Sequence, residues 1–291
     1  MTTSYFVSDL HGQVSRYESL FKEILNKKPS FVFLGGDLLP HVRKSTWLKD
    51  KQIDDFVSDY LIPGFRKVQK HLGCNYPEVF LIMGNDDHRA EEEKFRIGEN
   101  MELWRYLNNS RFKFGPYMIY GYPFVPPTPF QLKDWEKYDV SRYTDPGCIS
   151  PEEGYRSILP DYDTAYSSIM TDLELLTNDA PMEKAVFLFH SPPYQSNLDR
   201  AALDGMMVDH VPLDLHVGSI AIQRFIDEKQ PYITLHGHVH ESAAITGHWK
   251  QQFGRTISFS AAHDGPELSL VIFKLDDPAK AERVLIYPDG Q

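Results

Sequence analysis

The chain has 291 residues, of which 42% are hydrophobic and 24% charged, as is ordinary for a soluble globular protein. Its net charge of −11 at pH 7 disfavours nucleic-acid binding through a basic surface. No apolar run approaches the roughly 20 residues that a membrane helix needs. A strand expected from Tyr5 leaves no room for a signal peptide, and two cysteines cannot build a disulfide framework. We therefore expect a cytoplasmic protein that binds neither membrane nor nucleic acid.

Five short apolar runs, rich in β-branched and aromatic residues, predict buried strands. Amphipathic patterns predict helices at 15–27 and 52–72, and Ser219 is expected to cap a helix through Ile226 that Pro231 ends. Alternating strands and helices indicate parallel or mixed sheets with helices outside. The five runs are 5–8, 31–34, 79–83, 185–189 and 232–235.

Other elements are expected around these runs. A strand should open the segment at 117–124, and a helix should start near Glu91. The C-terminal part predicts two strands joined by a turn at 264–265, followed by a last strand at 281–288. His263 at that turn is expected to be solvated, and we leave it outside the site.

One region differs in composition: residues 116–166 hold eight of the sixteen tyrosines and eight of the twenty prolines. The part at about 123–163 has no steady period and is too long for an ordinary connection. Its aromatic side chains, in a segment stiffened by proline, suit a lid over a ligand. They would equally suit a packed surface excursion over the sheet. Because no linker or repeat is present, we predict one domain over 1–291 with this excursion as a lid that influences substrate choice.

Side chains of the types that commonly bind metals follow each of the five runs. In sheets of this class ligands bind at the carboxyl ends of the strands, so these side chains should converge. Each one alone has an ordinary explanation, such as a helix cap, a turn or a solvated histidine. Together they favour a metal site. The set consists of Asp9, His11, Asp37, Asn85, His190, His238 and His240.

Four imidazoles, two carboxylates and one amide exceed the needs of one tetrahedral site. They suit two metal ions about 3.5–4 Å apart that share a carboxylate. Asp37 follows a central strand and two glycines, so it is the expected bridge. The absence of a thiolate favours Mn, Fe, Zn, Co or Ni.

These motifs, D-x-H, G-D, G-N, a lone H and G-H-x-H in order over residues 9 to 240, resemble those of the calcineurin-like metallophosphoesterases. The resemblance implies an α/β fold, a four-layer α/β/β/α sandwich of two mixed sheets flanked by helices. It also implies hydrolysis of a small phosphodiester or phosphomonoester by a hydroxide that bridges two divalent or trivalent metal ions. One ion would be bound by Asp9, His11, Asp37 and His240, the other by Asp37, Asn85, His190 and His238.

The chain departs from the family pattern in one place. Many members have a histidine where this chain has Asp86, and an acidic residue where it has Pro40. Candidates for the missing general acid are His88, Asp86 and His41, each of which could also be a plain surface residue. We favour His88 over Asp86, because an imidazole can be protonated near neutral pH whereas an aspartate beside two cations should stay ionised.

Two other functions compete with the enzyme. A noncatalytic scaffold of the same fold could bind a protein partner, but a scaffold has no chemical need for all seven donors. A nuclease is disfavoured by the charge balance and by the absence of a basic stretch. The sequence specifies neither the natural substrate nor the oligomeric state.

Overall fold

The computed structural model describes residues 2–41, 53–178 and 180–288. Its centre consists of two six-stranded mixed sheets. The strands of the first sheet are β1 Thr3–Val7, β2 Phe31–Gly35, β3 Glu78–Ile82, β4 Arg105–Tyr106, β13 Leu268–Lys274 and β14 Asp277–Ile286. Those of the second are β5 Ser110–Phe114, β6 Tyr117–Tyr122, β7 Ala185–Phe189, β10 Ile233–His236, β11 Lys250–Phe253 and β12 Thr256–Ser260.

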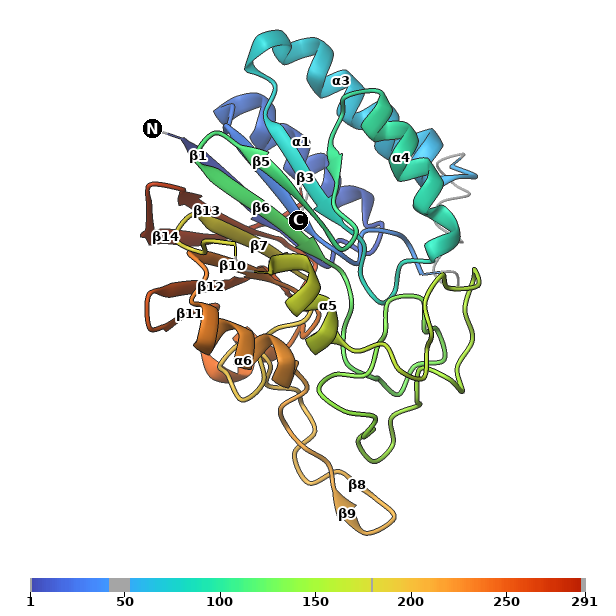
Figure 1. Ribbon diagram of the computed structural model, residues 1–291. Helices are drawn as coiled ribbons and strands as arrows, with labels where there is room; N and C mark the ends of the chain where they lie inside the picture. Colours follow the sequence, from blue (N-terminus) through green and yellow to red (C-terminus); the bar gives the residue numbers. More distant parts are fainter. Residues whose placement is uncertain (1, 42–52, 179, 289–291) are drawn as a thin grey trace.

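Helices cover the outer faces of both sheets, which gives four layers (Figure 1). The first sheet has the order β14-β13-β1-β2-β3-β4 and the second β11-β12-β10-β7-β6-β5. The α-helices are α1 Val14–Lys27, α3 Ile62–Leu72, α4 Glu92–Asn100, α5 Ile169–Thr177, α6 Ile220–Lys229 and α7 Ser242–Thr246. The expected sandwich is thus confirmed, and none of the helices described is long and apolar enough to cross a membrane.

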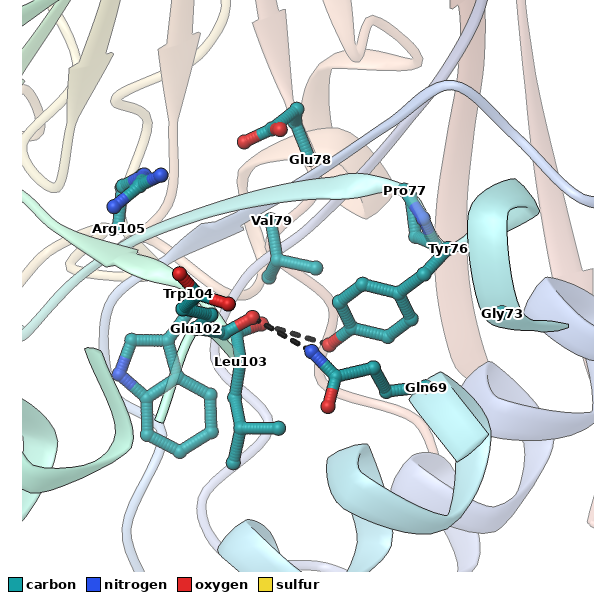
Figure 2. A pocket seen from close by; sticks show the side chains of 10 residues that line it. All are labelled: Gln69, Gly73, Tyr76, Pro77, Glu78, Val79, Glu102, Leu103, Trp104 and Arg105. Atoms are coloured by element: carbon teal, nitrogen blue, oxygen red, sulfur yellow. Dashed lines mark hydrogen bonds between the residues drawn. The ribbon is translucent and has the colours of Figure 1, made fainter. Parts of the chain in front are cut away.

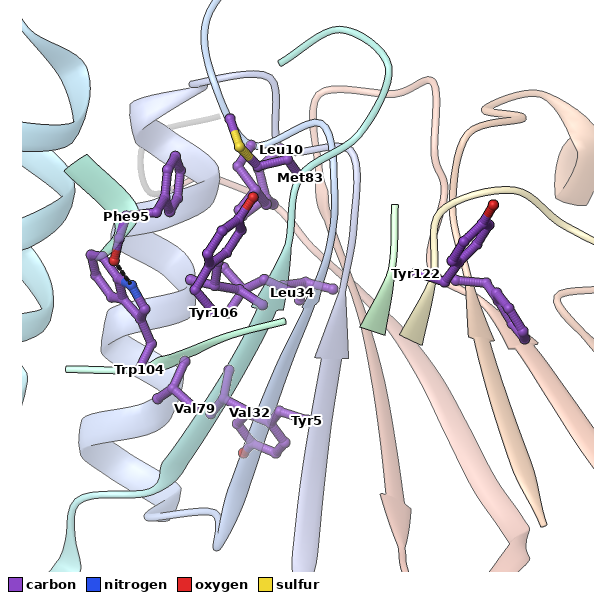
Figure 3. Close-up of a cluster of buried hydrophobic side chains, with 14 of the residues drawn as sticks. Tyr5, Leu10, Val32, Leu34, Val79, Met83, Phe95, Trp104, Tyr106 and Tyr122 are labelled. Atoms are coloured by element: carbon purple, nitrogen blue, oxygen red, sulfur yellow. Dashed lines mark hydrogen bonds between the residues drawn. The ribbon is translucent and has the colours of Figure 1, made fainter. Parts of the chain in front are cut away.

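Both faces of the central strands are buried, which explains why their sequences are apolar throughout rather than alternating. On β2, Phe33 lies in the apolar cluster between the sheets, together with Leu188 of β7. The next residue, Leu34, lies in the cluster that also contains Leu20 of α1. Figure 3 shows side chains of this outer cluster, among them Tyr5 of β1, Leu34 of β2 and Val79 of β3.

All five predicted strands form, and the expected bounds of two helices need correction. Residue 52, where the second helix was expected to begin, lies outside the described residues; among those described, this helix begins at Phe56 with a π-helical turn, capped by Asp55. The helix after Ser219 continues past Ile226 to the end of α6. The two strands expected on either side of 264–265 also form, β12 in the second sheet and β13 in the first, so the connection between them crosses from one sheet to the other.

The parallel strands bring the chemistry-bearing loops to one edge of the sandwich. In the first sheet β1, β2 and β3 run parallel, and in the second β6, β7, β10 and β12 do. The predicted ligands follow β1, β2 and β3 on one side and β7 and β10 on the other. The junction between the carboxyl ends of the two sheets is therefore where the functional side chains meet.

The tyrosine- and proline-rich excursion occupies residues 123–168, between β6 and α5 (Figure 1). It has almost no regular structure but is packed: Trp135 is fully buried, and Lys133 and Glu136 form a buried ion pair of 2.6 Å. A second projection, the short hairpin of β8 Met207–Val208 and β9 Val211–Pro212, extends away from the body.

Candidate metal centre

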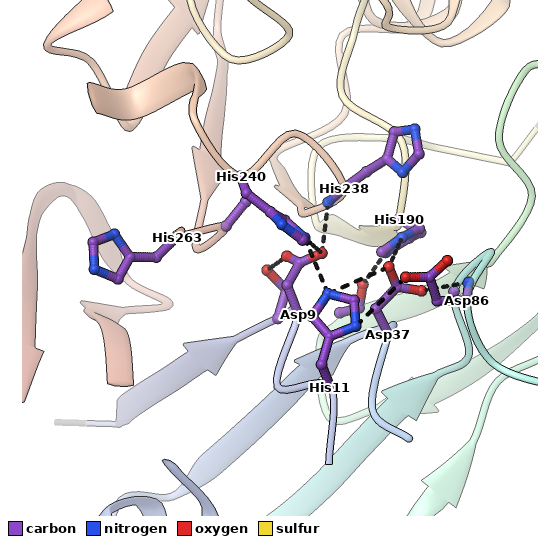
Figure 4. Close-up of polar contacts among 12 residues, drawn as sticks. Asp9, His11, Asp37, Asp86, His190, His238, His240 and His263 are labelled. Carbon is purple, nitrogen blue, oxygen red and sulfur yellow. Dashed lines mark hydrogen bonds and ion pairs between the residues drawn. The ribbon is translucent and has the colours of Figure 1, made fainter. Parts of the chain in front are cut away.

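Four of the predicted ligands lie close enough together to hold one metal ion. One ligand atom from each of Asp9, His11, Asp37 and His240 can be chosen so that all lie within 4.8 Å of one another. These residues come from the loops after β1, β2 and β10 (Figure 4). They are the same four residues that the family resemblance assigns to one of the two ions.

The remaining predicted ligands lie on the other side of Asp37. His190 Nε2 is 3.3 Å from Asp37 Oδ2 and 3.1 Å from Asn85 Oδ1. The ring of His238 lies 5.2 Å from that of His190. Asp37 Oδ2 is also 3.9 Å from His11 Nε2, so this carboxylate lies between the two sets. This placement is what a bridging carboxylate requires, and bridging itself stays a prediction.

The backbone of these loops is held in a conformation that non-glycine residues rarely adopt. Asp9, His11, Asp37 and His238 have φ angles of 55°, 45°, 52° and 72°. Such conformations cost of order 1 kcal/mol each and persist where the surroundings enforce them. Here the loops are bonded to each other: His11 N donates to Asp37 O at 2.8 Å. Strain concentrated at the predicted ligands is typical of a functional site.

Two glycines make room for the cluster. A Cβ atom at Gly36 would lie 2.6 Å from His190 Nδ1, and one at Gly84 would collide with the carboxylate of Asp37. The glycines of the G-G-D and G-N motifs therefore allow the backbone to approach the ligand side chains closely.

The cluster concentrates negative charge in a buried place. Burial alone would raise the pKa of the Asp37 carboxyl, but the imidazoles of His190 and His11 hold it well below its ordinary value. The Asp9 carboxyl is similar. Burial opposes its ionisation and His240 favours it, and the result is a pKa lowered to about 2. Two ionised, buried carboxylates need a nearby positive charge to be stable.

The histidines divide into two groups around these carboxylates. Burial would lower the pKa of His190, but Asp37 raises it to about 10. His238 is different, because burial lowers its pKa to about 3 and makes it a neutral nitrogen donor. His11 Nε2 and His240 Nε2 face each other at 3.0 Å, close enough for both nitrogens to approach one cation. The donor set therefore fits metal ions.

Two residues that support the cluster were not singled out from the sequence. Asp87 is buried and accepts bonds from the backbone N–H groups of Leu38, Leu39 and Gly84, which ties the β2 loop to the β3 loop. Burial and the charge of Asp37 raise the pKa of Asp87 to about 7. The sequence offered one hint of this role, the two consecutive aspartates after Asn85. Only the fold shows which of the two carboxylates turns inward.

Arg16 supports the β1 loop from the first turn of α1. Its guanidinium donates to Asp9 O at 2.6 Å and to His263 O at 3.3 Å. It therefore joins the first ligand loop to the connection between the two sheets. Its place inside a helical pattern gave no sign of this role.

His236 belongs to the core rather than to the ligand cluster. Its Nδ1 lies 2.9 Å from Ser191 O and its Nε2 lies 2.8 Å from Thr234 Oγ1. Burial lowers its pKa to about 4, so both ring nitrogens are used in the neutral form. Only the two later histidines, His238 and His240, are available as ligands.

The candidates for the general acid lie in different surroundings. The ring of His88 contacts the excursion, where Tyr155 Oη lies 3.2 Å from its Nδ1. Asp86 lies in the cluster, and His41 Nε2 is 2.6 Å from its Oδ2. His263 was expected to be solvated, but it is part-buried and its Nε2 lies 2.8 Å from the carboxylate of Glu267, apart from the cluster (Figure 4).

A hollow of about 300 Å³ lies at the opposite end of β3, around Tyr76, Glu102 and Arg105 (Figure 2). Its polar groups bond to the protein itself: Tyr76 Oη donates to Leu103 O at 2.7 Å, and Gln69 Nε2 to Glu102 O at 2.8 Å. Because these polar groups bond within the protein, the hollow shows no sign of a ligand. The strand-end cluster remains the candidate site.

Comparisons with known proteins agree with this geometry. The model of the calcineurin-like phosphoesterase family matches residues 3–242, and the chain belongs to this family. The protein TT1561 of Thermus thermophilus is 16% identical, with a TM-score of 0.57 over 98% of both chains. A dimetal phosphatase from Danio rerio is 9% identical, with a TM-score of 0.50 over 99% of both chains. At such identities the likeness establishes the fold alone, and comparison with curated proteins gave no match.

Proposed function

We propose that the protein hydrolyses small phosphoesters with the help of two metal ions bound between the sheets. The observation that carries the proposal is the convergence of seven donors from five distant loops at one strained, buried place. The structural likeness to a protein described as a dimetal phosphatase agrees with this proposal. Membership of the calcineurin-like phosphoesterase family supports this reaction type.

The ligand residues would divide between the two ions. Asp9, His11 and His240 would hold one ion, Asn85, His190 and His238 the other, and Asp37 both. Bound ions would activate a water molecule and neutralise charge on the phosphoryl oxygens. They would also reverse the field locally, which a chain of net charge −11 needs in order to accept an anionic substrate.

The loops contribute rigidity. His190 Nδ1 lies 2.8 Å from Gly35 O, which orients Nε2 toward Asp37 and Asn85. The backbone N of His238 donates to Asp9 Oδ1 at 2.9 Å, which joins the β10 loop to the β1 loop. Such partners fix the orientation of metal ligands and typically change metal affinity by about 10–100-fold.

The competing proposal, a noncatalytic scaffold, would not require this arrangement. A protein-binding surface has no need for buried carboxylates or for ligand residues with positive φ angles. Such features cost stability and are retained at functional sites.

The test is to load the purified protein with Mn, Fe, Zn, Co or Ni and to measure turnover of phosphomonoesters and phosphodiesters. Elemental analysis should give about two ions per chain, and a chelator should abolish turnover. At free metal 100-fold above its Kd, each bound ion should also add about 2.7 kcal/mol to the free energy of unfolding. Two bound ions without turnover on any ester would favour the scaffold, and no bound ion in a folded protein would remove the basis of the proposal.

A further inference from the structure

Arg156 differs from the other cations of the excursion, because its guanidinium forms no ion pair among the described residues. The other three, Lys133, Lys137 and Arg142, each form an ion pair of 2.6–2.7 Å with a carboxylate. The buried Nε, Nη1 and Nη2 atoms of Arg156 have no hydrogen-bond partner in the described part of the chain. A guanidinium keeps its proton in proteins, so it cannot escape the cost of burial by becoming neutral. Arg156 therefore needs acceptors and a negative charge that these residues do not supply.

Two further donors, Arg89 Nη1 and Tyr162 Oη, are likewise buried without a partner among the residues described. The other nitrogens of the Arg89 side chain are used: Nε donates to Glu92 Oε2 at 3.2 Å and Nη2 to Asp161 Oδ1 at 3.3 Å. The side chain of Asp161 is 83% exposed, so solvent weakens its effect on the charge of Arg89. Arg89 thus retains one donor and part of its positive charge.

Hydrogen bonds hold these three side chains in one part of the molecule. The carboxylate of Asp134 accepts from Arg89 N and from Ser157 N, each at 2.8 Å. This joins the excursion beside Arg156 to the connection between β3 and α4. Burial raises the pKa of the Tyr162 hydroxyl to about 12, although the positive charges of Arg156 and Arg89 lower it. Both guanidinium groups therefore act on the same hydroxyl.

The unbonded donors have the chemistry of an oxyanion site. Three of the atoms belong to Arg156, one to Arg89 and one to Tyr162. A guanidinium presents its N–H groups as a fork that matches two oxygens of a phosphate or a carboxylate. Water could accept some of these bonds but would leave the charge unbalanced. Five donor atoms exceed the roughly four acceptor positions of a carboxylate, so a tetrahedral anion fits better.

We propose that Arg156, Arg89 and Tyr162 form an internal binding site for inorganic phosphate, which balances the charge of Arg156 and holds the excursion against the β3–α4 connection. Because all five donor atoms are buried, the ligand is enclosed. This favours a small free anion over a phosphate group carried by a larger molecule. None of the three residues is a predicted metal ligand, and the site does not depend on the proposed hydrolysis.

The binding test is calorimetric titration of the purified full chain with inorganic phosphate, after dialysis against buffer without phosphate or sulfate. Arg156→Met keeps the length of the side chain but removes its charge and its donors. It should weaken binding at this site by about 10–100-fold, the contribution of charge-assisted hydrogen bonds. Arg156→Lys and Tyr162→Phe should weaken it less. Phosphate bound to metal ions would be common to all variants and would not change among them.

Arg142→Met is the matched control, because Arg142 belongs to the same excursion but is 55% exposed and already paired with Glu152. Phosphate binding should be the same in this variant as in the wild type. An equal loss in Arg142→Met and Arg156→Met would overturn the proposal, since it would indicate general attraction of phosphate to the positive charges of the excursion.

Thermal unfolding gives a second readout that does not depend on turnover. Without phosphate, Arg156→Met should be at least as stable as the wild type, because an apolar side chain replaces an unpaired buried charge. Phosphate at 100-fold above its Kd should raise the Tm of the wild type by about 5 °C or more and leave that of Arg156→Met unchanged. A destabilised Arg156→Met without phosphate would mean that the protein itself balances Arg156. An equal response of both proteins, or none, would also overturn the proposal.

Glycerol 3-phosphate and acetate test the identity of the ligand. Inorganic phosphate should bind more tightly than either, and only this order supports an enclosed site for a free tetrahedral anion. Tighter binding of glycerol 3-phosphate, lost in Arg156→Met, would overturn the assignment to free phosphate in favour of an organic phosphate. Equal binding of acetate would overturn the preference for a tetrahedral anion.

Discussion

Two irregular regions of this molecule, the strand-end loops and the excursion of residues 123–168, are both rich in buried polar groups. They differ in how charge is balanced. In the excursion, Lys133 Nζ bonds to Glu136 Oε2 at 2.6 Å and to Thr128 O at 2.9 Å, so cation and carboxylate satisfy each other. In the loops, the carboxylates of Asp9 and Asp37 face mainly imidazoles.

This difference separates a structural from a functional polar cluster. Buried charges that are paired within the protein stabilise one conformation of an irregular segment. Buried carboxylates grouped with imidazoles leave a place for a cation. We therefore infer that the excursion is a structural support and that the loops form the candidate site. The predictions below test this distinction.

The largest effect is expected from Asp37→Asn. This change removes the carboxylate charge between the two ligand sets, so it should lower turnover by about 10³-fold or more, since metal ions supply several kcal/mol of charge stabilisation. Asn85→Ala affects one set only and should cost less. Asp276→Asn, at an exposed position, is the control. Turnover and metal content of the variants check this; equal, mild losses for Asp37→Asn and Asn85→Ala would contradict the bridging role.

The next largest effect is expected from removing the side chain of Trp135, which anchors the excursion. Trp135 is fully buried, packs on Phe124, and donates from Nε1 to Asp87 O at 2.8 Å. Trp135→Ala should lower the free energy of unfolding by about 3–5 kcal/mol. Tyr166→Ala, whose side chain is 76% exposed, should stay within about 0.5 kcal/mol of the wild type. Denaturant unfolding measures both, and a small loss for Trp135→Ala would mean that the excursion is a loose lid.

A smaller effect should follow from Asp139, which ties the excursion to α6. Its carboxylate accepts bonds from Ser219 Oγ at 2.6 Å and from the backbone N–H groups of Ile220 and Ala221. Asp139→Ala should cost about 1–3 kcal/mol, the desolvation penalty of donors left without an acceptor. Unfolding curves of the variant at neutral pH check the value.

The same residue gives a pH dependence with a definite sign. Burial raises the pKa of Asp139 above its ordinary value of 3.8, despite the bonds that favour its charge. The folded state therefore binds the proton more tightly than the unfolded state, and this contribution to stability declines as pH rises from 3.8 through the raised pKa. Asp139→Asn should remove that decline, and an unchanged pH profile of the free energy of unfolding would contradict it.

The smallest effect is expected at the exposed rim of the excursion. Leu159 is 90% exposed, and Tyr155 lies over His88. Their substitution by Ala should raise KM for bulky esters about fivefold, since a small apolar contact contributes about 1 kcal/mol. KM for a small nitrophenyl ester should stay the same. Deleting residues 126–150 would not test this, because that stretch contains Trp135 and the buried ion pair. Equal KM changes for both substrates would argue against a role in substrate choice.

The sequence by itself determined the five central strands and the order of the ligand motifs. Buried parallel strands are apolar on both faces, and a polar residue directly after such a strand stands out. The seven predicted ligands could be named because each follows a strand end. By contrast, the π-helical start at Phe56 and the separation of β12 from β13 depend on contacts that no local pattern contains.

Only the tertiary structure decided which polar side chains meet. His41 and Asp86 lie far apart in the sequence and belong to different loops, so their contact could not be inferred from spacing. Likewise, of the two adjacent aspartates, Asp87 turns inward and accepts bonds from backbone N–H groups, while Asp86 faces the imidazole of His41. The apolar pattern can be read locally because a strand that is buried on both faces needs an apolar side chain at nearly every position. Pairing of polar groups is decided by distance in space, which the fold alone supplies.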